Sequence, residues 1–205
     1  MDGLSAGALW AENADLAAEA VAHPFVRGLA DGSLPVERFA AYIAQDAYFL
    51  ESFARAYALA LAHSPDRIGV EAFADLLAGV RSELGLHATY ARRWGADLAT
   101  VSPSPATLAY TDFLLATATV GGVGLTCAAM TPCMRLYAHL GQSLAGTKTS
   151  DTYAEWIGTY ADPAFEQLAV TLESLLDRYL DDAERGRVAY RRAMRLELDF
   201  FGAAG

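Results

Sequence analysis

The sequence VERFAAYIAQDAYFLESFARAYALALA, residues 36–62, decides the fold class. Its apolar side chains recur at steps of three and four residues, through Phe39, Ile43, Leu50 and Phe53. That spacing places them on one face of an α-helix, because 3.6 residues complete a helical turn. The segment therefore predicts a long helix that buries one face against other helices.

The same helical period continues on both sides of this segment, and no run of residues alternates as a half-buried β-strand does. Breaks rich in glycine and proline separate the helical patterns, but no long linker or repeat divides the chain. We therefore predict one all-α helical bundle, a single domain over residues 1–205. The expected helices are Leu9–Ala22, Val36–Ala62, Arg67–Ala96, Pro105–Val120, Gly124–Leu144, Asp151–Tyr160, Pro163–Asp181 and Glu184–Phe201.

The composition narrows the possible functions. The chain is 54% hydrophobic and 20% charged, which is typical of a globular protein. Its net charge is −10, and the arginine-rich stretch 185–195 is flanked by Glu184, Glu197 and Asp199. No basic stripe carries interleaved aromatic residues, so we expect no nucleic-acid binding.

The cysteines and the termini bear on location. Cys127 and Cys133 fit neither a disulfide framework nor a CxxC site, which indicates a reducing cytoplasm. The N-terminal residues lack the basic and apolar regions of a signal peptide. Residues 113–134 carry no charge, but their glycines, threonines and proline favour buried helices over a bilayer span. We therefore predict a cytoplasmic protein without a membrane segment.

Two carboxylates interrupt predicted apolar stripes. Asp46 lies between Ile43 and Leu50, and Glu197 shares a helical face with Met194. A buried carboxylate is costly unless it is paired, and burial raises its pKa toward the range useful for proton transfer. Asp46 could simply be bonded to a buried backbone group or tyrosine. Alternatively, both acids face a ligand.

Cys133 is a candidate nucleophile. Thr131 can cap a helix and Pro132 suits the first helical position, so this motif predicts Cys133 in a first helical turn. The helix dipole would then lower the pKa of the thiol. Cys127 is interpreted as a small buried hydrophobic residue, and the local pattern also allows Cys133 to be core.

Aromatic residues could form the walls of a flat cavity, and one of them lies one helical turn after Cys133. A thiol, two buried carboxyl groups and phenols together suit a planar, nitrogen-containing heteroaromatic compound that is protonated and attacked. The aromatic candidates are Tyr48, Phe49, Tyr110, Tyr137 and Tyr160.

Six segments, in order along the chain from His23 to Phe201, resemble the TenA family, the thiaminase II proteins. Together they extend over nearly the whole chain. They are HPFVRGLADGSL (23–34), YIAQDAYFL (42–50), YTDFL (110–114), Pro132-Cys133 with Tyr137, EWIGTY (155–160) and LELDFF (196–201).

This resemblance implies a haem-oxygenase-like helical bundle, usually a homotetramer, with a deep pocket between its helices. It implies hydrolysis of 4-amino-5-aminomethyl-2-methylpyrimidine to the hydroxymethyl pyrimidine, a step of thiamin salvage, and cleavage of thiamin at its methylene bridge. The expected partner is a small aminopyrimidine or thiamin. Neither a metal nor a cofactor is expected.

The resemblance also implies residue roles. Cys133 would be the nucleophile that adds to the pyrimidine ring, and Glu197 the acid/base partner at a ring nitrogen. Asp46 would hold the 4-amino group and Phe49 would stack against the ring. Three tyrosines would contact or orient the ring and the thiol: Tyr110, Tyr137 and Tyr160.

One departure and three alternatives stand beside this interpretation. Many members have an aromatic residue two positions after the cysteine, where this chain has Arg135, which could lower the pKa of the thiol further or alter a substrate subsite.

Glu83 and His87 have a spacing that can bind a metal, as in a di-metal oxidase. Such a site needs more ligands, however, and a structural role for His87 is favoured. A cofactor-free oxidase and a non-catalytic thiamin- or pyrimidine-binding regulator are the others. The regulator would need the pocket but not the thiol. The glycines at 121–124 are better explained by close helix packing than by a phosphate loop.

Overall fold

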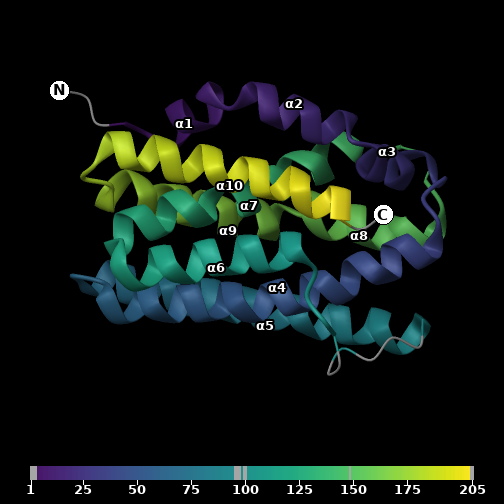
Figure 1. The fold of residues 1–205 in the computed structure, drawn as a ribbon, viewed down its shortest axis with the longest axis horizontal. Helices are drawn as coiled ribbons and strands as arrows, with labels where there is room; N and C mark the ends of the chain where they lie inside the picture. Colours follow the sequence, from purple (N-terminus) through teal and green to yellow (C-terminus); the bar gives the residue numbers. More distant parts are fainter. Residues whose placement is uncertain (1–3, 95–97, 99–100, 148, 204–205) are drawn as a thin grey trace.

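The computed structural model describes residues 4–94, 98, 101–147 and 149–203, which form ten α-helices and no β-strand (Figure 1). The predicted all-α fold class is confirmed. The helices are α1 (Ala6–Glu12), α2 (Ala14–Ala22), α3 (Pro24–Asp31), α4 (Val36–His63), α5 (Arg67–Trp94), α6 (Pro105–Val120), α7 (Gly122–Leu144), α8 (Asp151–Ala161), α9 (Pro163–Tyr179) and α10 (Ala183–Ala203).

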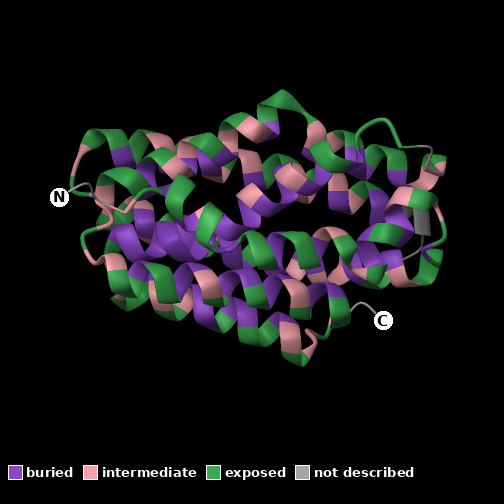
Figure 2. Ribbon diagram, turned by 90° about the horizontal axis from the view of Figure 1, so that it is seen from above, coloured by how far each residue is buried: buried purple, intermediate pink, exposed green. Residues whose placement is uncertain are grey.

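Helix α7 is the centre of the bundle. It contacts α4, α6, α8, α9 and α10, and nearly all of its side chains are buried. Figure 1 shows α4 and α5 on one side of it and α1–α3 on the other. Buried residues gather on the inward sides of the helices and exposed ones on the outside (Figure 2). The residues of α7 are apolar around most of the helix, as expected for a helix surrounded by others.

Helices α4 and α5 pack along each other, and the predicted stripe of α4 faces the core. Phe39, Ile43 and Phe53 in this stripe are almost completely buried. Asp46 is only 3% exposed, so the prediction of a carboxylate inside the apolar stripe is confirmed.

The N-terminal region differs from the prediction. The expected helix Leu9–Ala22 is divided at Asn13, whose side-chain amide donates to the carbonyl of Leu9 at 2.8 Å. Helix α3 was not expected, because eight residues containing a glycine show little helical period. Its start and end signals are nevertheless present. Pro24 occupies the first turn, and Gly32 ends the helix with a positive φ of 77°. The predicted end of the helix after Arg67, Ala96, lies outside the described residues.

The predicted helix start at Thr131 is wrong. Helix α7 continues through Pro132, and the hydroxyl of Thr131 donates back to the carbonyl of Cys127 at 2.8 Å. A proline inside a helix costs about 3 kcal/mol, because it removes one backbone hydrogen bond and crowds the preceding turn. The contacts of α7 with its neighbours offset this cost. Cys133 therefore lies in the middle of a buried helix, away from any helix terminus.

Two glycines of α7 allow close packing, and the first of them, Gly124, confirms the prediction for the segment 121–124. A Cβ on Gly124 would lie 2.2 Å from the carbonyl oxygen of Tyr179, and a Cβ on Gly141 would lie 2.3 Å from the carbonyl carbon of Tyr160. The second contact brings α8 directly against α7 and places Tyr160 beside Tyr137. Of the described helices, none combines the length and the hydropathy that a bilayer-spanning segment needs.

Candidate active site

A narrow cavity lies between α4, α5, α7, α8 and α9. The cavity has a volume of about 10 Å³, which leaves room for about one water molecule. A flat ring enters only if these side chains move apart. The cavity is lined by Asp46, Phe49, Leu50, Phe53, Glu83, Cys133, Met134, Tyr137, Tyr160 and Phe165.

Five of the predicted site residues line this cavity together, although they come from three different helices: Asp46, Phe49, Cys133, Tyr137 and Tyr160. The hydroxyl of Tyr137 is hydrogen-bonded to that of Tyr42 at 3.0 Å, and the rings of Tyr137 and Tyr160 meet edge to face. The aromatic candidate Tyr48 is half-buried and is not part of the lining.

The other two predicted residues, Glu197 and Tyr110, are fully buried beside the cavity rather than in its lining. The hydroxyl of Tyr110 donates to Oε1 of Glu197 at 2.6 Å. The ring of Tyr110 packs against that of Phe49, with centroids 4.8 Å apart. Helices α6 and α10 thus supply an acid and a phenol next to the side chains contributed by α4 and α7.

Cys133 and Glu197 are neighbours in the interior, and the carboxyl group of Glu197 acts on the pKa of the thiol. Burial raises the pKa of Glu197 to about 8, although the hydrogen bond from Tyr110 opposes this rise. Burial, and then the negative charges of Glu197, Glu83 and Asp46, raise the pKa of the Cys133 thiol well above its ordinary value. The predicted lowering of this pKa is wrong, because it depended on a helix terminus that the structure does not have.

The partner of Asp46 is His87, rather than a backbone group or a tyrosine. Oδ2 of Asp46 lies 2.7 Å from Nε2 of His87, and Nδ1 of His87 lies 2.9 Å from the carbonyl oxygen of Glu83. A carbonyl only accepts hydrogen bonds, so Nδ1 carries a proton. Burial alone would lower the pKa of His87, but the hydrogen bond and the charge of Asp46 raise it to about 9. The two side chains form a buried ion pair.

This pairing bears on the metal-oxidase alternative. Both ring nitrogens of His87 are already engaged, so neither offers a lone pair to a metal. Within the described residues, no group of three or more His, Cys, Asp and Glu side chains is arranged to hold a metal ion. The structural role expected for His87 is confirmed by its two hydrogen bonds.

Glu83 is a site residue that sequence reasoning considered only as a metal ligand. Its Oε1 accepts a hydrogen bond of 2.5 Å from the hydroxyl of Tyr160. Burial and the charge of Asp46 raise the pKa of Glu83, whereas the charge of His87 and the bond from Tyr160 lower it. A signal for this residue was present, because Glu83 and His87 continue the apolar stripe of α5 at steps of three and four. The other residues of that stripe are Phe73, Leu76, Val80 and Tyr90.

A surface groove adjoins the cavity. It runs between α5 and the junction of α8 with α9, and it shares Glu83 and Phe165 with the cavity. The ring of Phe165 packs edge to face on that of Tyr160, with centroids 4.9 Å apart. Glu83 and Phe165 thus form the boundary between the groove and the cavity that the thiol lines.

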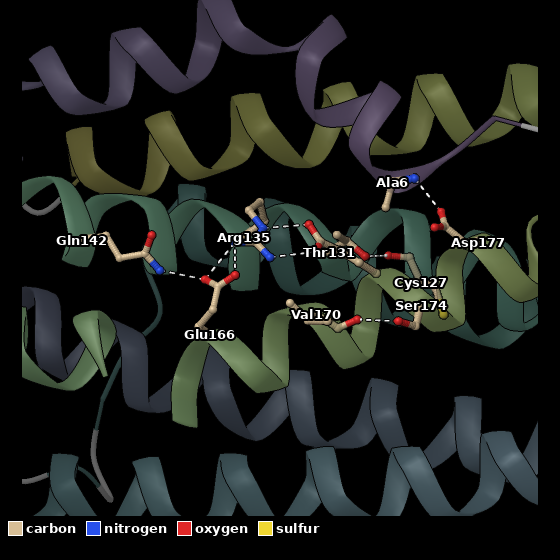
Figure 3. A network of polar contacts seen from close by, with 10 residues as sticks. Ala6, Cys127, Thr131, Arg135, Gln142, Glu166, Val170, Ser174 and Asp177 are labelled. Atoms are coloured by element: carbon tan, nitrogen blue, oxygen red, sulfur yellow. Dashed lines mark hydrogen bonds and ion pairs between the residues drawn. The ribbon is translucent and has the colours of Figure 1, made fainter. Parts of the chain in front are cut away.

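Arg135 is directed away from Cys133. It makes paired hydrogen bonds of 2.7–2.9 Å to Glu173 and Glu166 of α9, and the Gln142 amide also donates to Glu166 (Figure 3). Arg135 is absent from the cavity lining and from the influences on the thiol pKa. The expectation that Arg135 acts on the thiol is therefore wrong. Its guanidinium instead joins α7 to Glu166 in the first turn of α9 and to Glu173 beyond the middle of that helix.

Comparison with known proteins gives consistent sequence matches. Residues 10–204 match the model of the TENA/THI-4/PQQC family. The chain is 34% identical to an aminopyrimidine aminohydrolase of Halalkalibacterium halodurans, in a match covering 89% of this chain and 87% of that protein. It is 37% identical to the mitochondrial bifunctional TH2 protein of Arabidopsis thaliana, in a match covering 88% of this chain. The chain spans only 34% of the length of that plant protein.

Solved structures agree with the fold. A TenA family transcription regulator from Silicibacter sp. TM1040 superposes with a TM-score of 0.91 at 27% identity, covering 99% of this chain and 97% of that chain. A domain with a heme oxygenase-like fold from Shewanella denitrificans has a TM-score of 0.77 at 12% identity, covering 96% of this chain and 90% of that one. The predicted haem-oxygenase-like architecture is confirmed.

Proposed function

This chain belongs to the TENA/THI-4/PQQC family, and we propose that it is an aminopyrimidine aminohydrolase of the thiaminase II type. Its substrate would be 4-amino-5-aminomethyl-2-methylpyrimidine, its products the hydroxymethyl pyrimidine and ammonia, and it would also cleave thiamin. One observation carries the proposal. The Cys133 thiol faces a cavity with an ionised acid, Asp46, on one side and a protonated acid, Glu197, close to the sulfur.

The charged side of the cavity suits recognition of the ring. His87 holds one oxygen of Asp46, so the other oxygen can accept an N–H of the 4-amino group. Phe49 and Tyr137 provide apolar ring surfaces for the flat face of the pyrimidine. The 4-amino group, the leaving substituent and the attacked ring carbon are consecutive around a pyrimidine. A ring held at Asp46 by its amino group can thus direct the attacked carbon toward Cys133.

The neutral side suits proton transfer. The sulfur of Cys133 bonds to the ring carbon beside the one that carries the aminomethyl group. One oxygen of Glu197 takes the thiol proton as the other gives its proton to the adjacent ring nitrogen. This exchange avoids forming a free thiolate, which burial disfavours.

The second half of the reaction releases ammonia. Electrons from the 4-amino group expel the exocyclic nitrogen, so the C–N bond breaks and an exocyclic methylene forms. The oxygen of water bonds to this methylene carbon, and the proton that the water loses goes to the ammonia. The carbon–sulfur bond then breaks, the ring nitrogen returns its proton through Glu197 to the sulfur, and the ring is aromatic again. No redox step is involved.

An assay of ammonia release tests this proposal. The purified protein should convert the aminomethyl pyrimidine to the hydroxymethyl pyrimidine with one ammonia per turnover, measured by coupled ammonia detection and mass spectrometry. One solved relative is described as a TenA family transcription regulator, and a regulator would bind the pyrimidine without converting it. Binding without turnover would therefore contradict the proposed activity.

We also propose that residues 1–205 form one domain that works as a homotetramer in the cytoplasm. One cluster of buried apolar residues extends through all ten described helices, which supports a single domain. The free, buried cysteines are compatible with a reducing compartment. Val120 and Val188 are 82% and 66% exposed beside a groove between α6 and α10, and subunit contacts commonly cover such side chains. Light scattering after size-exclusion chromatography measures the oligomeric state.

A further inference from the structure

Glu83 has no task in the mechanism above, although its carboxyl lies in the same cavity as the reactive sulfur. It lines both the cavity and the adjoining surface groove, so it lies at the boundary between them. Its charge acts on the thiol of Cys133, and the charge of Asp46 acts on Glu83 in turn. Glu83 is therefore close to both groups that are proposed to hold and attack the ring.

The charges around the cavity leave Glu83 in a distinct position. The carboxylate of Asp46 is paired with the imidazolium of His87 at 2.7 Å. Glu197 is a neutral acid bonded to Tyr110. Within the described residues, the side-chain hydrogen bond to Glu83 comes from the neutral hydroxyl of Tyr160. A ligand that brings a positive charge to Glu83 would be favoured there, because it would provide the missing cationic donor.

The chemistry of the substrate supplies such a charge. The leaving substituent stands between the 4-amino group and the attacked carbon, so in the proposed pose it points to the region between Asp46 and Cys133. An aminomethyl group is a primary amine and is protonated near neutral pH. Its replacement in the product is a neutral hydroxymethyl group. Substrate and product thus differ in charge at the position that Glu83 faces.

We propose, on the basis of the proposed function, that Glu83 is the specificity-determining residue for the leaving group. Its carboxylate accepts hydrogen bonds from the protonated aminomethyl nitrogen and so favours cationic substituents over the neutral hydroxymethyl group. Tyr160 holds the carboxylate in place through the 2.5 Å hydrogen bond. The same contact is lost when ammonia departs, which favours release of the product through the groove.

Binding measurements in a variant that cannot react test this role. Isothermal titration calorimetry at pH 8, above the raised pKa of Glu83, would give the Kd of the aminomethyl and hydroxymethyl pyrimidines for Cys133→Ala and for Cys133→Ala/Glu83→Gln. Glutamine keeps an oxygen that can accept from Tyr160 but removes the charge. We expect the second variant to bind the aminomethyl pyrimidine at least ~10-fold more weakly, the scale of one charge-assisted hydrogen bond. The Kd of the hydroxymethyl pyrimidine should change by less than about threefold, because that ligand makes no charge-assisted bond.

Glu71→Gln in the same background is the matched control. Glu71 lies on the same helix but is exposed and paired with Arg67, so neither Kd should change. Tyr160→Phe, which frees the Glu83 carboxylate, should reduce the preference for the aminomethyl ligand in the same direction. If circular dichroism shows that the Glu83 variant is unfolded, the two Kd values of the Tyr160→Phe variant test the role of Glu83 instead.

The possible failures are distinguishable. If Cys133→Ala binds neither pyrimidine, the proposed function fails and the role of Glu83 fails with it. Suppose instead that Cys133→Ala binds both pyrimidines, and that adding Glu83→Gln weakens binding of the two ligands equally or leaves both affinities unchanged. The proposed function then survives. In that case the assignment of Glu83 is overturned.

Discussion

Asp46 and Glu197 are both carboxyl groups buried among apolar side chains, but they differ in charge state. Each is a carboxyl group in an apolar helical stripe, and each is almost completely buried. Asp46 meets the imidazolium of His87 and is ionised, whereas Glu197 meets the neutral hydroxyl of Tyr110 and the thiol of Cys133 and stays protonated near pH 7. Burial favours the neutral form of a carboxyl group, as it does for Glu197, and a cationic partner such as His87 beside Asp46 offsets it.

The two acids divide the site into two regions. The α4–α5 region carries fixed charges and is suited to holding a polar ring. The α6–α10 region carries a movable proton and is suited to transferring it. Cys133 on α7 lies between them, so changes in each region should have different effects on binding, turnover and stability.

The largest effect is expected at the point where the two regions meet. Cys133→Ser should reduce ammonia release by at least ~10³-fold, because a hydroxyl is a much weaker nucleophile, while binding of the hydroxymethyl pyrimidine stays largely intact. Cys127→Ser is the control, since Cys127 is also buried on α7 but lies outside the cavity lining. Turnover in the Cys133 variant comparable to that of the wild type would remove this residue from the mechanism.

Breaking the charged region should affect stability asymmetrically. His87→Leu leaves the carboxylate of Asp46 buried without its partner and should lower the free energy of unfolding by about 3 kcal/mol or more. Asp46→Asn should cost less, because a neutral His87 keeps its proton on Nδ1 and its Nε2 can accept from the new amide. Urea unfolding of both variants measures the difference. Equal losses would mean that the pair is not ionised.

Removing the proton from the neutral region should affect turnover more than binding. Glu197→Gln should slow ammonia release by at least ~100-fold, the usual scale for loss of a general acid or base. The affinity for the hydroxymethyl pyrimidine should change little. Glu51→Gln, an exposed acid on α4, is the control. A rate within a few-fold of the wild type would assign the proton transfer to another group.

The most gradual effect concerns pH and stability. The pKa of Glu197 is raised by folding to about 8, so the folded protein binds this proton more tightly than the unfolded chain does. The contribution of this bound proton to the free energy of unfolding is therefore fully present at pH values below the unfolded pKa of about 4.5. It is lost as the pH rises toward 8. Relative to Glu197→Gln, the wild type should lose up to about 1.4 kcal/mol per pH unit in this range.

Urea unfolding of both proteins at several pH values between 5.5 and 8.5 measures this difference. The pKa of His87 is also raised by folding, to about 9, so the stabilisation that His87 contributes is likewise lost as the pH rises, but only near pH 9. That contribution is common to both proteins and cancels. A difference between the two proteins that stays constant with pH would show that Glu197 is already ionised.

The sequence predicts the two acids but not their partners. A helical period is local, so it places Asp46 and Glu197 on buried faces without a structure. The same test applied to α5 would also have indicated Glu83 and His87, which continue its apolar stripe. That His87 meets Asp46 depends on the packing of α4 against α5, which no local pattern contains.

The surroundings of Cys133 were the least predictable part. Thr131 and Pro132 have the local preferences of a helix start, and these preferences are overridden by the packing around α7. Arg135 is likewise close to Cys133 along the chain, two residues after it. In a helix, residues two positions apart point in different directions, and Arg135 instead reaches the acids of α9.

The narrowness of the cavity bears on which nucleophile completes the reaction. Once ammonia leaves, the vacated space matches a single water molecule, since the two have nearly the same size. Under the proposed mechanism, a nucleophile larger than water would reach the exocyclic methylene only if these side chains stayed apart, as they must when the leaving group is the thiazolium of thiamin. With the aminomethyl pyrimidine, the tight packing between α4, α5 and α7 would then favour hydrolysis over exchange of the leaving group for larger nucleophiles.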